Sequence, residues 1–213
     1  MYLPQVFRED RLEILHALMR THPLATLVTA GPGGTKANLL PFSIIPSEGK
    51  GTLQAHLAKA NDQIADLRTG AEALVIFQGP EAYIMPSWYA TKAEHGKVVP
   101  TWNYVVVQAR GNPRVIEDHG WLRAQINTLT EAHEAPRQDP WSVTDAPAGF
   151  VTAQLNGIIG LEIPVSSIEG KWKVSQNRRE ADRRGVCEGL REEDAGGEMA
   201  RLVGREMPPV CPG

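Results

Sequence analysis

Short β-rich segments separated by turn signals constrain the fold of this 213-residue chain more than any other feature. Segments near residues 24–30, 37–45, 51–57 and 104–116 are rich in β-formers and are bounded by Gly, Pro and Asn. The expected helices lie between these segments without strict strand–helix alternation. A parallel nucleotide-binding sheet needs that alternation, so its absence predicts a mainly β, α+β fold: an antiparallel barrel with flanking helices.

Turn chemistry predicts how the strands connect. The Gly-Pro-Gly-Gly run at residues 31–34 predicts a hairpin between the first two segments. Gly79-Pro80 predicts a second hairpin, joining a strand at 72–77 to one at 82–85. Two further strands are expected near the end, at residues 157–168 and 171–175.

Helical signals fall in four places. Residues 10–21 carry an apolar face, residues 61–67 follow a strand, and Asp118 caps a helix that runs to about His133. A fourth helix is expected over residues 177–190. After Asp194 the apolar content is low, which predicts a loosely packed tail.

These elements predict two parts. Residues 1–176 form the barrel domain, and residues 177–213 form a C-terminal helical extension packed on or beside it. A hydrophobic share of 42% in a chain of this length is enough for one well-buried core.

Net charge, cysteine spacing and the lack of long apolar stretches predict which partners, metals and cellular location are expected. The net charge of −3 argues against a protein that is basic overall, although a local basic patch remains compatible with it. Cys187 and Cys211 match no zinc spacing, so no metal is expected. No apolar stretch approaches the ~18 residues of a membrane helix, and no signal peptide is visible, so we expect a cytoplasmic protein.

The segment from His56 to Gln63 follows a strand and opens a helix. Helix N-termini favour phosphate, Lys59 adds a cation and Asn61 adds an amide. The alternative is that Asn61 simply caps the helix. The candidate binding residues of this corner are His56, Leu57, Lys59, Asn61 and Gln63.

Trp102 and Asn103 place an indole beside an amide, just before the strand expected to begin at Tyr104. A flat aromatic next to hydrogen-bonding groups suits a planar heterocycle. The alternative is that Trp102 and Tyr104 pack the barrel or a dimer interface.

Residues 173–178 form the sharpest polar cluster, where strand gives way to helix. Its candidate binding residues are Lys173, Ser175, Gln176, Asn177 and Arg178. The alternative is helix capping with nucleic-acid contact, because six Lys or Arg between residues 171 and 184 face only two acids there. The candidate DNA contacts are Arg179, Arg183 and Arg184.

Four signatures in order along the chain resemble the PaiB-type family, described as FMN-binding negative transcriptional regulators. They are Met1-Tyr2-Leu3-Pro4 with Phe7, residues 56–63, residues 99–104 and residues 173–178. The resemblance runs from Met1 to about Leu190. It implies an FMN-binding split β-barrel similar to the pyridoxamine phosphate oxidase group, and a homodimer with the flavin at the subunit interface.

The same resemblance implies roles for particular residues. Ala37, Asn38 and Leu39 would line the isoalloxazine ring, and the corner at residues 56–63 would receive the phosphate. From the residues alone, Leu39 and Leu40 are instead expected in the core, with Lys36 in solvent.

Three functions stay open at this level. The first is an FMN-binding transcriptional regulator that contacts DNA. The second is a flavin-dependent oxidoreductase that uses NAD(P)H and an unknown acceptor, and the third is a flavin-free interaction module. No side chain is assigned as a catalytic acid or base.

Overall fold

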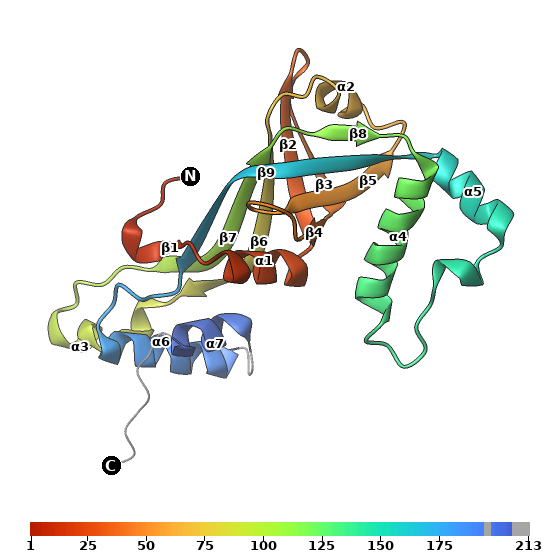
Figure 1. The fold of residues 1–213 in the computed structure, drawn as a ribbon. Helices are drawn as coiled ribbons and strands as arrows, with labels where there is room; N and C mark the ends of the chain where they lie inside the picture. Colours follow the sequence, from red (N-terminus) through yellow and green to blue (C-terminus); the bar gives the residue numbers. More distant parts are fainter. Residues whose placement is uncertain (194–196, 206–213) are drawn as a thin grey trace. The chain divides into compact units, whose positions relative to one another are not determined.

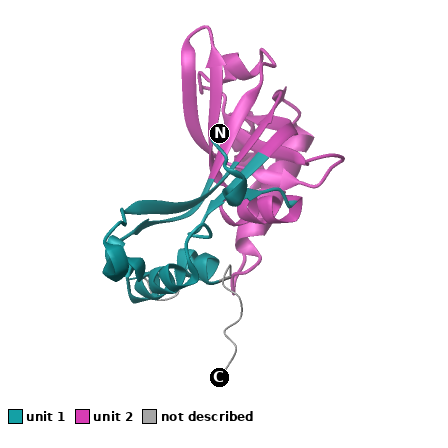
Figure 2. Cartoon of the chain, turned by 90° about the vertical axis from the view of Figure 1, so that its left-hand side faces the viewer, with its two compact units in different colours: residues 1–11, 78–107, 169–213 teal, residues 12–77, 108–168 magenta. Residues whose placement is uncertain are grey.

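The computed structural model describes residues 1–193 and 197–205 (Figure 1). Its contacts divide the chain into two compact units (Figure 2). Unit 1 comprises Met1–Arg11, Gln78–Val107 and Glu169–Gly213, and unit 2 comprises Leu12–Phe77 and Gln108–Ile168. Three strands, β6, β7 and β9, contribute residues to both units.

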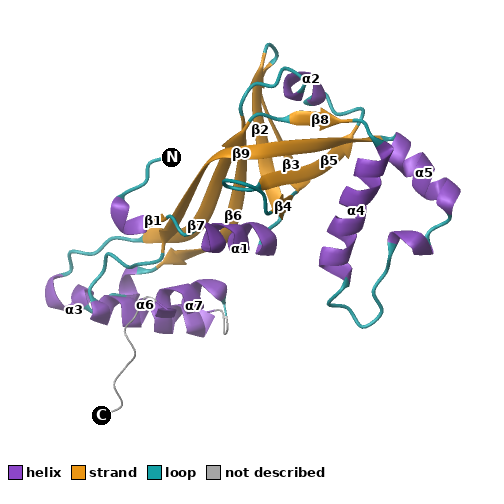
Figure 3. Cartoon of the chain, in the orientation of Figure 1, coloured by secondary structure: helices purple, strands orange, loops and turns teal. Residues whose placement is uncertain are grey.

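Nine strands in the described residues pair in the order β3-β2-β6-β7-β9-β5-β4, with β1 and β8 also paired to β9. The ladders of β2 with β3 and of β5 with β9 are antiparallel. The strands are β1 (Arg8–Glu9), β2 (Leu24–Gly31), β3 (Gly34–Pro41), β4 (Ser43–Ile45), β5 (Thr52–Ala58), β6 (Ala73–Ile84), β7 (Thr101–Gly111), β8 (Arg114–Ile116) and β9 (Ile158–Lys173). This antiparallel sheet with flanking helices confirms the expected fold class (Figure 3).

The helices flank these strands. They are α1 (Leu12–Thr21), α2 (Ile64–Leu67), α3 (Thr91–His95), α4 (His119–Glu134), α5 (Ala148–Asn156), α6 (Glu180–Glu193) and α7 (Glu198–Arg205), with short 3₁₀ turns η1 (Gln5–Phe7), η2 (Pro86–Trp88) and η3 (Val143–Asp145). The expected cap of α4 is present, because Asp118 Oδ1 accepts a hydrogen bond from the Trp121 N–H at 2.7 Å. None of these helices has the length and apolar character of a membrane span.

The core of unit 2 follows the period-two alternation of its strands. Strand β2 buries Ala25, Leu27 and Thr29 on one side. Phe42 and Phe77 meet edge to face, with ring centroids 6.1 Å apart. A smaller cluster joins α4, η3 and α5 through Leu122, Val143, Val151 and Leu155.

The Gly79-Pro80 hairpin is wrong, because β6 runs unbroken from Ala73 to Ile84. Its ladder with β2 extends only over Leu74–Ile76. Pro80 lies beyond that ladder, so its missing N–H removes no hydrogen bond to β2.

Strand β9 is likewise one strand where two were expected. The expected break lies at Glu169 and Gly170, between the two predicted strands. Instead β1 pairs there, with Glu9 opposite Gly170 and Arg8 opposite Lys171.

Three helices, α3, α5 and α7, have no counterpart among the four expected ones. Both η3 and α5 lie between the expected helix that ends near His133 and the expected strand at residues 157–168, a stretch for which no element is predicted. The predicted loose tail is wrong for Glu198–Arg205, which forms α7 and buries Met199, Ala200 and Val203 in unit 1. These three buried residues are too few to raise the apolar content of the segment after Asp194, on which the prediction is based. Residues 206–213 lie outside the described part of the chain.

Candidate functional site

Each unit contains one polar cluster that brings predicted residues together. In unit 2, the cluster joins the β2–β3 hairpin to the corner after β5. In unit 1, it joins the start of β7 to the end of β9. We call them the Gln63 network and the Lys173 cluster.

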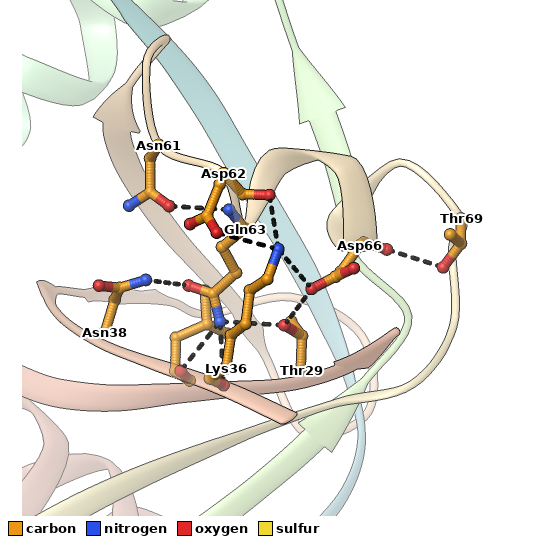
Figure 4. Close-up of polar contacts among 9 residues, drawn as sticks. Thr29, Lys36, Asn38, Asn61, Asp62, Gln63, Asp66 and Thr69 are labelled. Atoms are coloured by element: carbon orange, nitrogen blue, oxygen red, sulfur yellow. Dashed lines mark hydrogen bonds and ion pairs between the residues drawn. The ribbon is translucent and has the colours of Figure 1, made fainter. Parts of the chain in front are cut away.

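Gln63 is the centre of the unit 2 cluster and is fully buried. Its Nε2 donates to Leu27 O at 3.2 Å and to Thr29 Oγ1 at 3.1 Å (Figure 4). Its Oε1 accepts from Asn38 Nδ2 at 2.9 Å. The hairpin register pairs Leu27 with Asn38, which places both partners on adjacent strands.

Lys36 is neutralised by acidic residues at the same corner. Its Nζ lies 3.2 Å from Asp62 Oδ2 and 3.5 Å from Asp66 Oδ2. The hydrogen bond to Asp62 raises the pKa of Lys36. Asp66 is buried and also accepts from Thr29 Oγ1 at 3.3 Å. Lys36 is therefore not an unpaired cation for a phosphate.

The backbone amides of the corner are largely used by the chain itself. The Gln63 N–H donates to Asn61 Oδ1 at 2.9 Å, and the Ile64 N–H donates to Asn61 O at 3.2 Å. The Lys59 N–H donates to Gly157 O. The helix that follows, α2, has only four residues. Asn61 caps the turn that precedes α2, whose own N-cap residue, Gln63, makes no side-chain cap hydrogen bond.

The other predicted residues of this corner differ in exposure. Lys59 is exposed beside a pocket of about 320 Å³, in which Arg68 pairs with Glu117 at 2.6 Å. Leu57 is buried in the core. His56 is half-buried, with Nδ1 2.8 Å from Gln125 Oε1.

Strand β3 presents its predicted residues at one end of the sheet order. Ala37 is exposed, Asn38 is half-buried and Leu39 is 63% exposed. Leu40 is buried. The core prediction therefore holds for Leu40 and is wrong for Leu39.

In unit 1, Ser175 lies two residues beyond the end of β9 and has a left-handed backbone, at φ 65°. Its Oγ accepts a hydrogen bond from Asn103 Nδ2 at 2.9 Å, and both side chains are buried. Gln176 folds back on the strand: its Oε1 accepts from the Val174 N–H, and its Nε2 donates to Trp172 O. These contacts shape the turn that follows the strand.

Lysines 171 and 173 lie against the ring of Tyr104, because alternate residues of β9 share one face. Lys173 Nζ donates to Thr101 Oγ1 at 2.5 Å and to Trp102 O at 2.6 Å. Burial, followed by repulsion from Lys171 and Arg178, lowers the pKa of Lys173. The cluster therefore carries positive charge that an anion would relieve.

Arg178 stacks on Tyr89, with its guanidinium carbon 4.6 Å from the ring centroid. Tyr89 is buried, and burial raises its pKa. Asn177 is exposed beside this stack. Trp102 is 53% exposed and meets Tyr83 edge to face at 5.7 Å.

Two of the three arginines predicted to contact DNA form ion pairs within the protein. Arg179 lies 3.5 Å from Glu94, and Arg184 pairs with Glu180 one helical turn away. Arg183 is half-buried, and its Nε and Nη2 are buried without a hydrogen-bond partner among the described residues.

Lys171, Thr29 and Asp66 were missed by sequence reasoning. Lys171 could have been found, because it shares a strand face with Lys173. Thr29 and Asp66 carry no local signal, since their contact joins residues 37 positions apart.

Residues 1–167 match the model of a family described as "Putative FMN-binding domain". An uncharacterized protein of Emericella nidulans is 36% identical over 95% of this chain and 96% of its own length. The Bacillus subtilis "Protease synthase and sporulation protein PAI 2" is 31% identical, over 91% of each chain. The chain belongs to this FMN-binding, PaiB-type family, whose cofactor is FMN.

Solved structures show the same fold at low identity. The FAD and heme binding protein from Mycobacterium smegmatis matches with a TM-score of 0.56 and 16% identity, over 78% of this chain and 73% of that one. The flavocytochrome Anf3 from Azotobacter vinelandii matches with a TM-score of 0.55 and 13% identity, over 78% and 69%. The fold is a split β-barrel.

The side chains present fit an anionic flavin. The Lys173 cluster combines cations with aromatic rings, including the exposed indole of Trp102. Ammonium and guanidinium groups suit a phosphate, and a flat aromatic suits the isoalloxazine. In unit 2, β3 presents the Asn38 amide between the exposed side chains of Ala37 and Leu39.

Proposed function

We propose that this chain is an FMN-binding protein of the PaiB type that acts as a negative transcriptional regulator, with FMN held in a homodimer. The observation that carries the binding proposal is the Lys173 cluster. There, two lysines share one strand face with an aromatic ring, and Arg178 adds a further charge. Family membership supports the cofactor, and the PaiB resemblance supports the regulatory role.

Each unit supplies candidate contacts of its own. In unit 1, Lys173 and Arg178 are our candidates for the FMN phosphate, and Trp102 for the ring. Asn103 and Ser175 stabilise the turn after β9 through their hydrogen bond. Gln176 and Asn177 are the remaining proposed FMN contacts of unit 1. In unit 2 the proposed contacts are Ala37, Asn38, Leu39, His56, Lys59 and Asn61, while the buried Leu57 and Gln63 support these residues without touching the flavin. When bound, the isoalloxazine supplies the redox chemistry, and the protein supplies binding and electrostatics.

Exposed apolar side chains support the homodimer. Leu39 is 63% exposed on β3, and Trp102 and Tyr83 are 53% and 44% exposed on β7 and β6. Contiguous apolar side chains in contact with water are typical of surfaces that pair with another chain, and Tyr83 and Trp102 meet each other edge to face.

The first experiment is the visible absorption spectrum of purified protein, before and after adding FMN and desalting. We expect a flavin spectrum that survives desalting. Substitution Lys173→Gln removes a charge from the cluster and should weaken FMN binding about tenfold, because charge-assisted hydrogen bonds contribute about 1.5 to 3 kcal/mol. The matched control is Lys97→Gln, at an exposed lysine outside the cluster. Protein that never takes up FMN would support the flavin-free interaction module instead.

The regulatory half needs a DNA-binding measurement. We expect binding to duplex DNA that weakens as salt rises, because contacts to phosphates release counterions. Replacing Arg183 and Arg184 by Ala should reduce affinity and flatten the salt dependence. No binding at low salt would rule out direct DNA contact.

A flavin-dependent oxidoreductase that uses NAD(P)H is the second candidate. It is supported by the fold, which is shared with the flavocytochrome Anf3. Under anaerobic conditions, NAD(P)H should bleach the visible band of the flavin-loaded protein. A flavin that stays oxidised with both nicotinamides and with varied acceptors would count against this candidate.

A further inference from the structure

The hydrogen-bond polarity of the Gln63 side chain is fixed by the backbone around it. Its nitrogen lies 3.2 Å from Leu27 O and 3.4 Å from Lys36 O. Backbone carbonyls can only accept hydrogen bonds. The Nε2 group must therefore face these two oxygens, and Oε1 must face the opposite way, towards Asn38.

Two further residues impose the same orientation. Thr29 Oγ1 donates its proton to Asp66 Oδ2, so it is left to accept from Gln63 Nε2 at 3.1 Å. Asp66 is itself held by Lys36, whose Nζ lies 3.5 Å away. With every donor and acceptor assigned, the buried amide has one satisfied orientation, and reversing it would leave buried groups unpaired.

The orientation of the Gln63 amide also fixes the orientation of the Asn38 amide. Gln63 Oε1 only accepts, so Asn38 must turn its Nδ2 inward, and the distance of 2.9 Å agrees. Figure 4 shows the Asn38 oxygen directed away from Gln63. Asn38 lies half-buried on β3, between the exposed Ala37 and Leu39. The strand therefore presents a carbonyl oxygen of fixed orientation at this position.

We propose that Gln63 is a positioning residue, which orients Asn38 so that Asn38 Oδ1 accepts a hydrogen bond from the imide N–H of the flavin ring. This inference rests on the proposed FMN binding. The pyrimidine edge of isoalloxazine carries one N–H, at N3, between two carbonyl oxygens. An oriented acceptor attracts that N–H and repels the oxygens beside it, so it selects the register of the ring. Gln63 itself is fully buried and acts only through Asn38.

The test compares FMN with its N3-methyl analogue, which lacks this donor. Dissociation constants for both ligands are measured by flavin fluorescence with the full-length protein. The wild type should bind the analogue about tenfold more weakly, the size expected for one hydrogen bond that is lost and leaves an unpaired acceptor. In Asn38→Ala and Gln63→Leu, this discrimination should fall to about twofold or less, whereas a loss of fold would weaken both ligands alike.

The matched control is Gln54→Leu, the same change at a half-buried glutamine that pairs with Glu162 on the β5–β9 ladder. It should keep the tenfold discrimination. If Gln63→Leu does not fold, Asn38→Ala and Thr29→Val decide the question. Discrimination that persists in Asn38→Ala overturns the inference, as does a wild type that binds both flavins equally. A wild type that binds neither flavin overturns the proposed function as well.

Discussion

Ser175 adopts a left-handed backbone conformation that glycine tolerates better, yet a serine occupies the position. Its buried hydroxyl accepts the hydrogen bond of Asn103. The strain of the backbone is thus offset by a contact that glycine could not make. This contact also ties the start of β7 to the end of β9.

Two substitutions at Ser175 separate these effects. Ser175→Ala keeps the strain and leaves the buried Asn103 amide unpaired, which should lower the free energy of unfolding by about 1 to 3 kcal/mol. Ser175→Gly loses the same hydrogen bond but relaxes the backbone, which recovers about 1 kcal/mol. Urea unfolding should rank the wild type first, Gly second and Ala last, with the exposed Ser87→Ala unchanged. An alanine variant more stable than the glycine variant would contradict this account.

The lowered pKa of Lys173 predicts that, as pH rises, the stability of the fold increases while the retention of FMN decreases. Its pKa is lowered by burial and by the charges of Lys171 and Arg178. Above the lowered pKa, the unfolded chain binds more protons than the folded one, so stability rises with pH up to the ordinary lysine pKa. FMN retention should fall over the same window, because the phosphate loses a cation. The measurement is an FMN titration from neutral to alkaline pH.

The control for this prediction is Lys173→Arg, because a guanidinium keeps its charge throughout the window. Its FMN affinity should change less with pH. Equal slopes in wild type and variant would mean that Lys173 does not contact the flavin.

At the scale of elements, α6 shows why glycine can be needed inside a helix. A Cβ on Gly185 would lie 2.0 Å from the backbone oxygen of Trp88, and one on Gly189 would lie 2.3 Å from its ring. These glycines let η2 approach the helix closely. Beside them, the Asp182 carboxylate accepts from the Thr91 N–H and hydroxyl, each at 2.9 Å.

Alanine should therefore destabilise α6, although it normally favours a helix. We expect Gly185→Ala to lower the free energy of unfolding by about 1 to 3 kcal/mol, the usual range for overpacking. Gly204→Ala in α7 is the control, because its Cβ would meet Cys187 Sγ at an ordinary 3.5 Å. That control should be neutral or more stable by up to about 1 kcal/mol. Thermal unfolding of both variants tests the contrast, and equal shifts would contradict it.

At the scale of the whole molecule, the homodimer is the proposal with the most consequences. Substitution Leu39→Lys places a charge on the exposed apolar residue of β3. Light scattering should show a shift from dimer to monomer, and FMN retention should fall in parallel. Ala17→Lys, at an exposed position of α1, should leave the mass unchanged. A wild type that is monomeric and still retains FMN would rule out a flavin site shared between subunits.

The division at residue 176 and the cytoplasmic location remain predictions. Limited proteolysis tests the first: a stable fragment that ends near Gln176 would support a separate barrel domain. The contacts of α6 with Trp88 and Thr91 argue that such a fragment would lose stability, since those residues would meet water.

Local signals predicted much of the fold. The β2–β3 hairpin, the apolar face of α1 and the Asp118 cap each depend on residues a few positions apart. The Gly79-Pro80 turn failed because a proline breaks a strand only where its N–H is needed by a neighbour. Helix α7 was missed because its buried face contains few residues and depends on packing within unit 1.

By itself, the sequence determined the antiparallel fold class, the family and the residue types available for a flavin, because these depend on periodicity and on ordered motifs. Only the tertiary structure decided which side chains meet. It joined Asn103 to Ser175 across 72 residues and Gln63 to Asn38 across 25. It also showed Lys36 paired with Asp62, and Arg179 and Arg184 paired with Glu94 and Glu180. Burial, hydrogen-bond polarity and ion pairing depend on partners distant in the chain, and no local pattern records them.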